Sequence, residues 1–264
     1  MKQKTMITRL GTLLLLGNGI NLLCVTTGHA LELAASLQWS KRVELATPVS
    51  GVIKSVQANI GDRVKQGDVL VKLDERNYAA ALEMARAKVK SLDEKRKEAK
   101  RQLDRAQELY NRTVLSEHEL QTAKNGKVEA DSDYATAKSE LVSAEFNLEY
   151  TILRAPFDAV VLQRNAEVGQ TVVSQLKPEV LFILGSAGEM IARGLIAQSD
   201  LNGSLQGRSA SVNVTGKRYE GKVRHVGLEP MQTDKQGIYY EIAVVFNPGE
   251  RILRAGQQVT ISLP

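Results

Sequence analysis

Two short segments of the chain repeat one another across a long gap, and this repeat constrains the fold more than any other feature. Residues 47–64 and 155–172 align without a gap at a constant offset of 108 positions, which places Gly61 on Gly169. Both segments alternate apolar residues as strands do, with a glycine at each expected turn. Each half is too short to bury a sheet face alone, so we expect the two to pair into one small β module.

The segment between the repeats, 75–150, has the composition of continuous helix. The chain has no proline from 49 to 155, and Gly126 is the only glycine between Gly67 and Gly169. A stretch so poor in breakers and rich in Ala, Leu, Glu, Lys and Arg favours helix. Residues that repeat every seven positions form a heptad seam, the line along which two helices pack, in both halves of the segment. Most members of this seam are followed by an alanine three positions later. Its members are Leu82, Val89, Arg96, Leu103 and Tyr110, then Leu120, Lys127, Tyr134, Leu141 and Leu148.

The heptads break near residues 113–116, where Ser116 and Glu119 have the spacing of a capping box that starts a helix. We therefore expect two antiparallel helices, over about 75–113 and 117–150. Each would be roughly 50–55 Å long at a rise of 1.5 Å per residue. Because the flanking halves have to meet, this hairpin should project from the β module as a single arm.

Residues 1–30 have the features of an export signal. A positive start is followed by an apolar stretch, which glycines and asparagines interrupt, and by small residues at a cleavage position: Lys2, Lys4 and Arg9, then 10–25, then Gly28 and Ala30. A cleaved signal peptide explains this pattern better than a retained membrane anchor, which is the alternative. Cys24, the only cysteine, would leave with the signal, so the mature chain would have no thiol for a disulfide or a metal.

Beyond residue 185 the composition indicates a second β unit. Short strand-like runs are separated by Gly and Pro, which predicts a small β-barrel: 191–197, 209–215, 219–228, 238–246 and 257–263. The N-terminal strand segment, 31–43, is expected to add a strand to this barrel.

Charge and chemistry exclude several function classes. Removing the three cations of the signal lowers the net charge from +5 to +2, which gives no case for nucleic-acid binding. His118 and His225 are isolated, without metal-ligand spacing around them. No nucleophilic triad, carboxylate pair or phosphate-binding loop is recognisable. We therefore assign no catalytic residues, no cofactor and no metal, and expect a protein that is not an enzyme.

The two halves resemble the biotinyl/lipoyl-carrier module, and the mature chain resembles the periplasmic adaptor (membrane fusion protein, HlyD-like) family. The resemblance implies an elongated α+β fold. A lipoyl-like β-sandwich (barrel-sandwich hybrid) over 44–74 plus 151–184 is interrupted by the α-helical coiled-coil hairpin at 75–150. A β-barrel domain over 185–264 follows. Larger members continue into a membrane-proximal domain, whereas this sequence stops at Pro264.

The carrier resemblance points to one position in particular. Aligning the Gly-Asp-Val-Leu run at 67–70 with the carrier pattern places Asn77 where the lysine that bears biotin or lipoate would stand. An asparagine amide cannot form that linkage. The resemblance therefore implies the carrier scaffold without its prosthetic group.

The hairpin tip carries a second resemblance. Adaptors that dock on TolC-type exit ducts have an arginine, a leucine four residues later and a serine seven further on. Arg105, Leu109 and Ser116 match this spacing. Arg105 and Leu109 would share one helical face. The alternative interpretation is a charged coil position, a packing leucine and a helix cap.

Together the resemblances imply a non-catalytic periplasmic adaptor, peripheral to the inner membrane. It would link an inner-membrane efflux or secretion transporter to a TolC-type outer-membrane channel, as a homo-oligomer, trimer or hexamer. A resistance-nodulation-division (RND) transporter is favoured over an ABC exporter, because the signal is interpreted as cleaved. The alternatives are an envelope scaffold without a transport role and a degenerate biotin/lipoyl carrier. The sequence does not identify the transported substrate.

Overall fold

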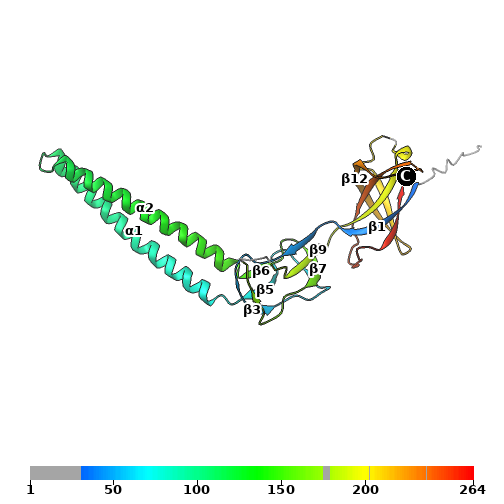
Figure 1. Ribbon diagram of the computed structural model, residues 1–264, viewed down its shortest axis with the longest axis horizontal. Coiled ribbons are helices and arrows are strands. Elements are labelled where there is room, and N and C mark those ends of the chain that lie inside the picture. The colour runs from blue at the N-terminus through cyan, green and yellow to red at the C-terminus, as the bar shows by residue number, and fades with distance from the viewer. Residues whose placement is uncertain (1–30, 175–178, 202, 236) are drawn as a thin grey trace, which may run out of the picture.

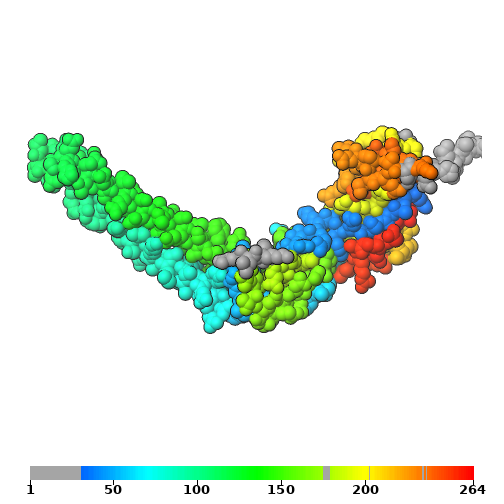
Figure 2. All heavy atoms as spheres, viewed as in Figure 1, coloured from blue at the N-terminus to red at the C-terminus, as the bar shows by residue number. Residues whose placement is uncertain are grey.

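The computed structural model describes residues 31–174, 179–201, 203–235 and 237–264. Three units follow one another along the molecule: a helical hairpin, a β-sandwich and a closed β-barrel (Figure 1). The hairpin is slender, and the molecule bends at the sandwich (Figure 2). The expected signal peptide, 1–30, lies outside the described residues. No helix in the described ranges is both long and apolar enough to cross a membrane.

The hairpin consists of α1 (Arg76–Asn111) and α2 (Glu117–Glu149), joined by residues 112–116. The strands are β1 (Leu31–Trp39), β2 (Arg42–Leu45), β3 (Gly51–Val56), β4 (Arg63–Val64), β5 (Val69–Leu73), β6 (Ile152–Arg154), β7 (Ala159–Arg164), β8 (Thr171–Val172), β9 (Phe182–Ser186), β10 (Met190–Ala197), β11 (Ser209–Val214), β12 (Lys217–Asp234), β13 (Gly237–Phe246) and β14 (Gln258–Leu263), with a short 3₁₀ turn, η1 (Gln198–Asp200), after β10.

The sandwich contains two four-stranded sheets, ordered β2-β9-β7-β4 and β6-β5-β3-β8. Side chains from both sheets form one hydrophobic core between them, with Ile53, Leu70, Val161 and Phe182 among its most buried members. The alternation of apolar residues in the two repeats produces this core, because every second side chain of a strand faces the same side.

The two repeat halves exchange strands reciprocally. β4 of the first half pairs with β7 of the second, and β8 of the second pairs with β3 of the first. The turn bonds are equivalent too: the Gly61 N–H donates to the Val161 carbonyl, and the Gly169 N–H donates to the Ile53 carbonyl, both at 2.9 Å. Partners in one pair are offset by 108 from partners in the other. The prediction that the halves fold against each other as one module is confirmed.

The glycines of these two turns have equivalent backbones. Gly61 has a φ of 91° and Gly169 a φ of 87°, in the left-handed region that glycine adopts without steric cost. Each turn is closed by a side chain three residues on: Asp62 Oδ2 accepts from the Asn59 N–H at 2.8 Å, and Gln170 Oε1 accepts from the Glu167 N–H at 2.9 Å. The repeat therefore extends to turn geometry.

The hairpin matches the heptad prediction closely. α1 spans 36 residues and α2 spans 33, about 54 and 50 Å at 1.5 Å per residue. The helices end at Asn111 and Glu149, slightly earlier than the expected 113 and 150. Leu82, Leu120 and Ala137 are among the few buried residues between the helices. Two ion pairs join the helices along one edge, Lys88–Glu140 at 2.6 Å and Lys95–Asp133 at 3.2 Å.

The C-terminal unit is a closed six-stranded barrel, ordered β1-β10-β13-β12-β11-β14. Its core includes Leu37, Met190, Ile196, Ile242 and Ile261, all fully or almost fully buried. β1 pairs with both β10 and β14, so the N-terminal segment closes the barrel, as expected.

Two expected boundaries are wrong. Residues 42–43, assigned to the barrel's strand segment, lie in β2 and pair with β9 in the sandwich. The strand expected to end at 228 continues to Asp234, because β13 extends alongside it and supplies backbone partners. Pro230 is tolerated inside β12 because register shifts flank it on both sides, and such irregularities remove the need for its missing N–H.

The sole tryptophan marks the junction between barrel and sandwich. Trp39, at the end of β1, packs against the barrel core, and a Cβ on Gly185 of β9 would lie 2.6 Å from its ring. Arg63 of the sandwich also donates to the Gly249 carbonyl of the barrel at 3.1 Å. Close ring-on-glycine packing and this bond join the two units.

Candidate partner-binding site at the hairpin tip

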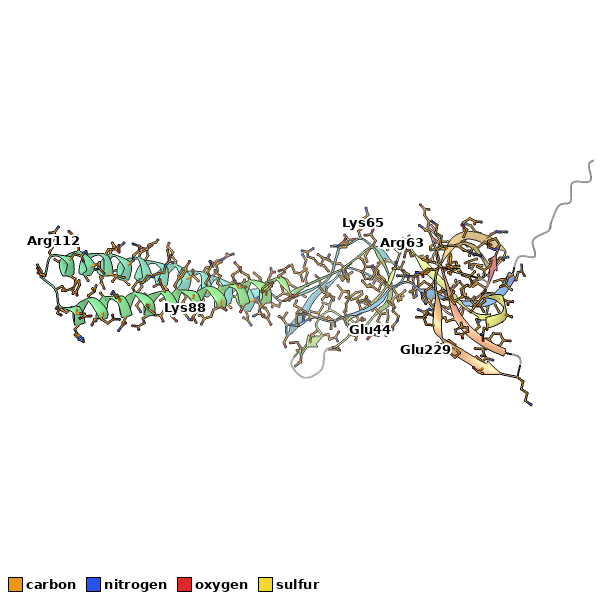
Figure 3. The ribbon with its side chains drawn as sticks, turned by 90° about the horizontal axis from the view of Figure 1, so that it is seen from above. Glu44, Arg63, Lys65, Lys88, Arg112 and Glu229 are labelled. Atoms are coloured by element: carbon orange, nitrogen blue, oxygen red, sulfur yellow. The ribbon has the colours of Figure 1, made fainter. Side chains whose placement is uncertain are left out.

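The turn at the tip is closed by backbone bonds to the last turn of α1. The Leu109 carbonyl accepts from the N–H groups of Arg112, at 3.2 Å, and Val114, at 3.0 Å. Thr113 has a φ of 59°, a left-handed conformation that is unusual for a β-branched residue. This tight turn fixes the position of the residues around it. Arg112 projects from the end of the hairpin (Figure 3).

Ser116 starts α2 through a reciprocal capping box, as predicted. The Glu119 N–H donates to Ser116 Oγ at 3.3 Å, and the Ser116 N–H donates to Glu119 Oε2 at 3.0 Å. The Ser116 hydroxyl also donates to Glu119 Oε2 at 2.7 Å. This hydroxyl bond is the main reason that the pKa of the Glu119 carboxyl lies below its usual value. Ser116 remains exposed while it performs this structural role.

Arg105 and Leu109 lie on one face of α1, four residues apart. The Arg105 side chain is 65% exposed and pairs with Glu98 at 3.1 Å. Glu98 also binds Arg101, and this hydrogen bond is the main cause that lowers the pKa of its carboxyl. Arg105 is therefore one of two arginines on a single carboxylate, and its guanidinium keeps donors free for another partner.

Leu109 and Ser116 flank the turn, whereas Arg105 lies one helical turn below Leu109. Leu109 is bonded to the turn through its carbonyl, and Ser116 begins the next helix two residues beyond Val114. The sequence prediction missed Val114, which is 71% exposed at the tip beside the partly exposed Leu109 and Tyr110. A valine within the heptad break, where no seam position can bury it, is the signal that would have identified it.

A shallow groove of about 590 Å³ runs between the helices below the tip. Its floor is formed by small residues, and charged or polar side chains line its edges: Ala99, Ala123, Gly126 and Ala130, then Lys95, Glu98, Gln102, Glu119, Thr122 and Glu129. Because Glu98 borders this groove and pairs with Arg105, the groove and the tip face adjoin.

The base of the hairpin carries Asn77, the position that the carrier resemblance aligns with the modified lysine. Asn77 is exposed in the first turn of α1. The Tyr78 hydroxyl donates to the Ser50 carbonyl at 2.6 Å, and the Leu73 N–H donates to the Thr151 carbonyl at 2.8 Å. Both ends of the hairpin are thus bonded to the sandwich beside Asn77.

Neither His118 nor His225 belongs to a cluster of side chains that could bind a metal ion. His225 Nε2 lies 3.3 Å from Glu241 Oε1, and Glu241 also pairs with Arg193 at 3.0 Å on the barrel. Within the described ranges, no three His, Cys, Asp or Glu side chains gather in a way that would hold a metal ion.

Sequence comparisons match the sandwich with its hairpin to a known family. A family profile described as "CzcB-like, barrel-sandwich hybrid domain" matches residues 41–184. The chain is 28% identical over 240 residues to the macrolide export protein MacA of Yersinia pestis, covering 84% of this chain and 64% of that protein. It is 25% identical over 194 residues to the cobalt-zinc-cadmium resistance protein CzcB of Cupriavidus metallidurans, covering 71% of this chain and 36% of that protein. The chain thus spans less than two thirds of these relatives.

Solved structures share the architecture. MacA from Actinobacillus actinomycetemcomitans superimposes with a TM-score of 0.66 at 23% identity, covering 89% of this chain and 78% of that one. The membrane fusion protein Spr0693 from Streptococcus pneumoniae R6 also gives 0.66, at 18% identity, covering 89% and 98%. These likenesses establish that the same fold occurs in both.

Proposed function

Because the chain belongs to the CzcB-like barrel-sandwich hybrid family of membrane fusion proteins, we propose that it is a periplasmic adaptor of an efflux pump. It would lie at the inner membrane and join a transporter there to a TolC-type channel in the outer membrane. Its contribution is mechanical rather than catalytic: it supplies a wall and a spacer, and the transporter supplies the energy.

One observation carries this proposal: the reciprocal strand exchange forces the hairpin outward as an arm with a free tip. Both ends of the hairpin return to the same edge of the sandwich, where β5 pairs with β6. The arm of about 50 Å can therefore only extend away from the sandwich, as Figure 1 shows. An arm of this kind can bridge two separate partners.

The tip is the part of the arm that we assign to the channel. Arg105 offers unused donors, and Leu109 and Val114 offer exposed apolar surface beside them. Arginine is enriched among the residues that dominate binding at protein interfaces, and apolar surface is buried at the centre of such interfaces. Ser116 contributes by shaping the turn, and its exposed hydroxyl retains acceptor capacity.

Several copies are required to surround a transport path, so we propose a homo-oligomer, a trimer or a hexamer.

The preference for an RND transporter over an ABC exporter rests on the N-terminal signal being cleaved. The energy source tests this preference. Collapse of the proton gradient at constant ATP should stop export through an RND transporter, whereas an ABC exporter would continue.

The docking test replaces Arg105 and Ser116 by aspartate. Ser116→Asp is informative because aspartate is also a good N-cap, so α2 should still begin there while the tip gains a negative charge. Arg105→Asp reverses the charge on the docking face. We expect a strain that carries both substitutions to become as sensitive to toxic compounds as a strain that lacks the gene. The probes are a macrolide and salts of cobalt, zinc and cadmium, chosen from the names of two relatives.

Lys222→Asp, an exposed change on β12 of the barrel, is the matched control and should keep export normal. Immunoblotting checks that all variants accumulate equally. Unchanged resistance in the double tip variant at normal protein level would contradict docking through the tip. No sensitivity in the deletion strain to any of these probes would leave the envelope scaffold as the better explanation.

A further inference from the structure

A shallow groove of about 540 Å³ lies on the outer wall of the barrel. Barrel and hairpin tip are at opposite ends of the molecule (Figure 1), so the groove is remote from the proposed docking residues. Its volume is within the range of about 300–1,000 Å³ that is usual for ligand sites. Polar and charged side chains of four barrel strands border it, among them Glu32, Gln38, Arg193, Tyr239, Glu241 and Gln258.

The groove forms where β1 and β10 diverge. The register between these strands ends at Ala35 and Gly194; beyond this point, among the described strands, β1 pairs with β14 alone and β10 with β13 alone. The outward-facing side chains of β1 are also small here, at Ala34 and Ser36, and they alternate with residues that face the barrel core. The divergence of the strands and the small side chains together leave the hollow.

The charges of the groove are nearly balanced. Arg193 Nη1 donates to both carboxylate oxygens of Glu241, at 3.0 and 3.1 Å, and His225 Nε2 lies 3.3 Å from the same carboxylate. Glu32, an exposed residue, is the remaining charged side chain that lines the groove, and it has no ion pair within the described part of the chain. An unpaired carboxylate is unfavourable beside an anion. The groove is therefore unsuited to ligands rich in phosphate or carboxylate groups.

Neutral polar side chains supply most of the unused hydrogen-bonding capacity. Ser36, Gln38, Tyr239 and Gln258 form no side-chain hydrogen bond with any other described residue, and Ser36 and Tyr239 are half-buried. Hydroxyl and amide groups both donate and accept hydrogen bonds. They match a ligand whose own groups do both, which is the property of a sugar hydroxyl. The Tyr239 ring and Leu195, which is 38% exposed, add apolar surface for the C–H face of a sugar ring.

We infer that this groove binds a neutral oligosaccharide. Sugar hydroxyl groups exchange hydrogen bonds with Ser36, Gln38 and Gln258, and one sugar ring rests on Tyr239. From Glu32 to Gln38 the groove extends about 20 Å along β1, at about 3.3 Å per residue, which accommodates several linked sugars rather than one. Strand faces of small barrels bind oligosaccharides in other folds. The site does not involve the hairpin, so this inference goes beyond the proposed adaptor role.

Titration of the purified protein with two neutral sugars, chitotetraose and maltotetraose, tests the inference. We expect the NMR signals of the backbone amides of Ser36, Leu195 and Tyr239 to shift and to saturate. Binding in an open groove is weak, so the titration extends to about 10 mM sugar, where a complex with a Kd of about 1 mM is about 90% formed. Tighter binding of chitotetraose identifies an N-acetylated glycan as the ligand, and tighter binding of maltotetraose identifies a plain glucan; each result supports the inference.

Variants place the binding in the groove. Ala34→Trp fills the hollow from an exposed position and should weaken binding by about tenfold, equal to about 1.4 kcal/mol. Lys222→Trp, an exposed change on β12 outside the groove, is the matched control and should leave the Kd unchanged. Gln38→Ala combined with Gln258→Ala removes two exposed amides without a partner in the described chain, so it should weaken binding without affecting the fold. Circular dichroism and melting temperatures check that each variant is folded.

Three outcomes would overturn the inference. The first is no shift with either sugar at the highest concentration, and the second is binding that Ala34→Trp leaves unchanged. The third is equal or tighter binding of tetra-alanine at the same residues, which would make the groove a peptide site. The assay needs neither channel nor transporter, so failure of the adaptor role would leave its result unchanged.

Discussion

The sandwich and the hairpin are stable for different reasons. The sandwich depends on pairing between strands about 100 to 120 positions apart, which close around fully buried residues such as Phe182 and Leu184. The hairpin depends on local helix formation, a thin seam in which Leu82 is one of few buried residues, and ion pairs between exposed side chains. Exposed ion pairs contribute little to stability. The surface of the hairpin can therefore vary to suit partners, whereas the sandwich core cannot.

The largest expected difference comes from removing a phenylalanine in each region. Phe182→Ala empties a fully buried core position and should lower the free energy of unfolding of the sandwich by about 3–5 kcal/mol. Phe146→Ala on α2, where the ring is 51% exposed, should change stability by only about 0.5 kcal/mol. Guanidinium unfolding, followed by Trp39 fluorescence for the β units and by circular dichroism for the helices, measures both. Equal losses would show that the two regions do not differ in this way.

A glycine-to-alanine change should lower the free energy of unfolding in the sandwich and raise it in the hairpin. No heavy atom lies within 4 Å of an added Cβ at Gly169 or at Gly126, so only the backbone differs. Gly169→Ala forces alanine to a φ of 87° and should destabilise the sandwich by about 1–2 kcal/mol. Gly126→Ala, inside α2, should stabilise the helix by about 0.5–1 kcal/mol. The same unfolding curves measure both, and changes of the same sign would contradict the comparison.

The smallest expected effect lies where the two regions join. Arg76 donates hydrogen bonds to Asp74 and lowers the pKa of this carboxyl from 3.8 to about 2. A lowered folded-state pKa gives stabilisation that is complete above the unfolded value and is lost as the pH falls. Asp74→Asn should therefore flatten the acid limb of the stability curve between pH 3.8 and about 2. Asp68→Asn, on an exposed turn of the sandwich, is the control. An unchanged acid limb in Asp74→Asn would contradict the assignment.

The sequence predicted the structure best where it depends on neighbouring residues or on segments that repeat at a constant offset along the chain. The heptads and the spacing of Ser116 and Glu119 determined the hairpin, because helix formation and capping depend on neighbours in sequence. The 108-residue offset determined the pairing of the halves, because only mutual pairing lets each short segment bury its apolar face.

The sequence predicted less where the extent of an element depends on a distant strand. β12 runs past residue 228 because β13 lies beside it, and no residue close to 228 in the sequence predicts this extension. The division between β1 and β2 likewise depends on β10 and β9, far along the chain. At the tip, the cap at Ser116 was predicted, whereas the exposed Val114 was missed although its place in the heptad break indicated it. Docking through Arg105 and Leu109 stays a prediction, since it depends on a second molecule.

The reciprocal strand exchange also makes the span of the protein adjustable. β3 and β7 each find their partner in the opposite half, so closure of the sandwich is independent of how many residues separate Leu73 from Thr151. Heptads can be deleted or inserted in matched pairs, one in each helix at the same level, without altering seam or register. Each pair changes the span by about 10 Å. The length of the arm can therefore change in steps of one heptad while the sandwich that carries it stays the same.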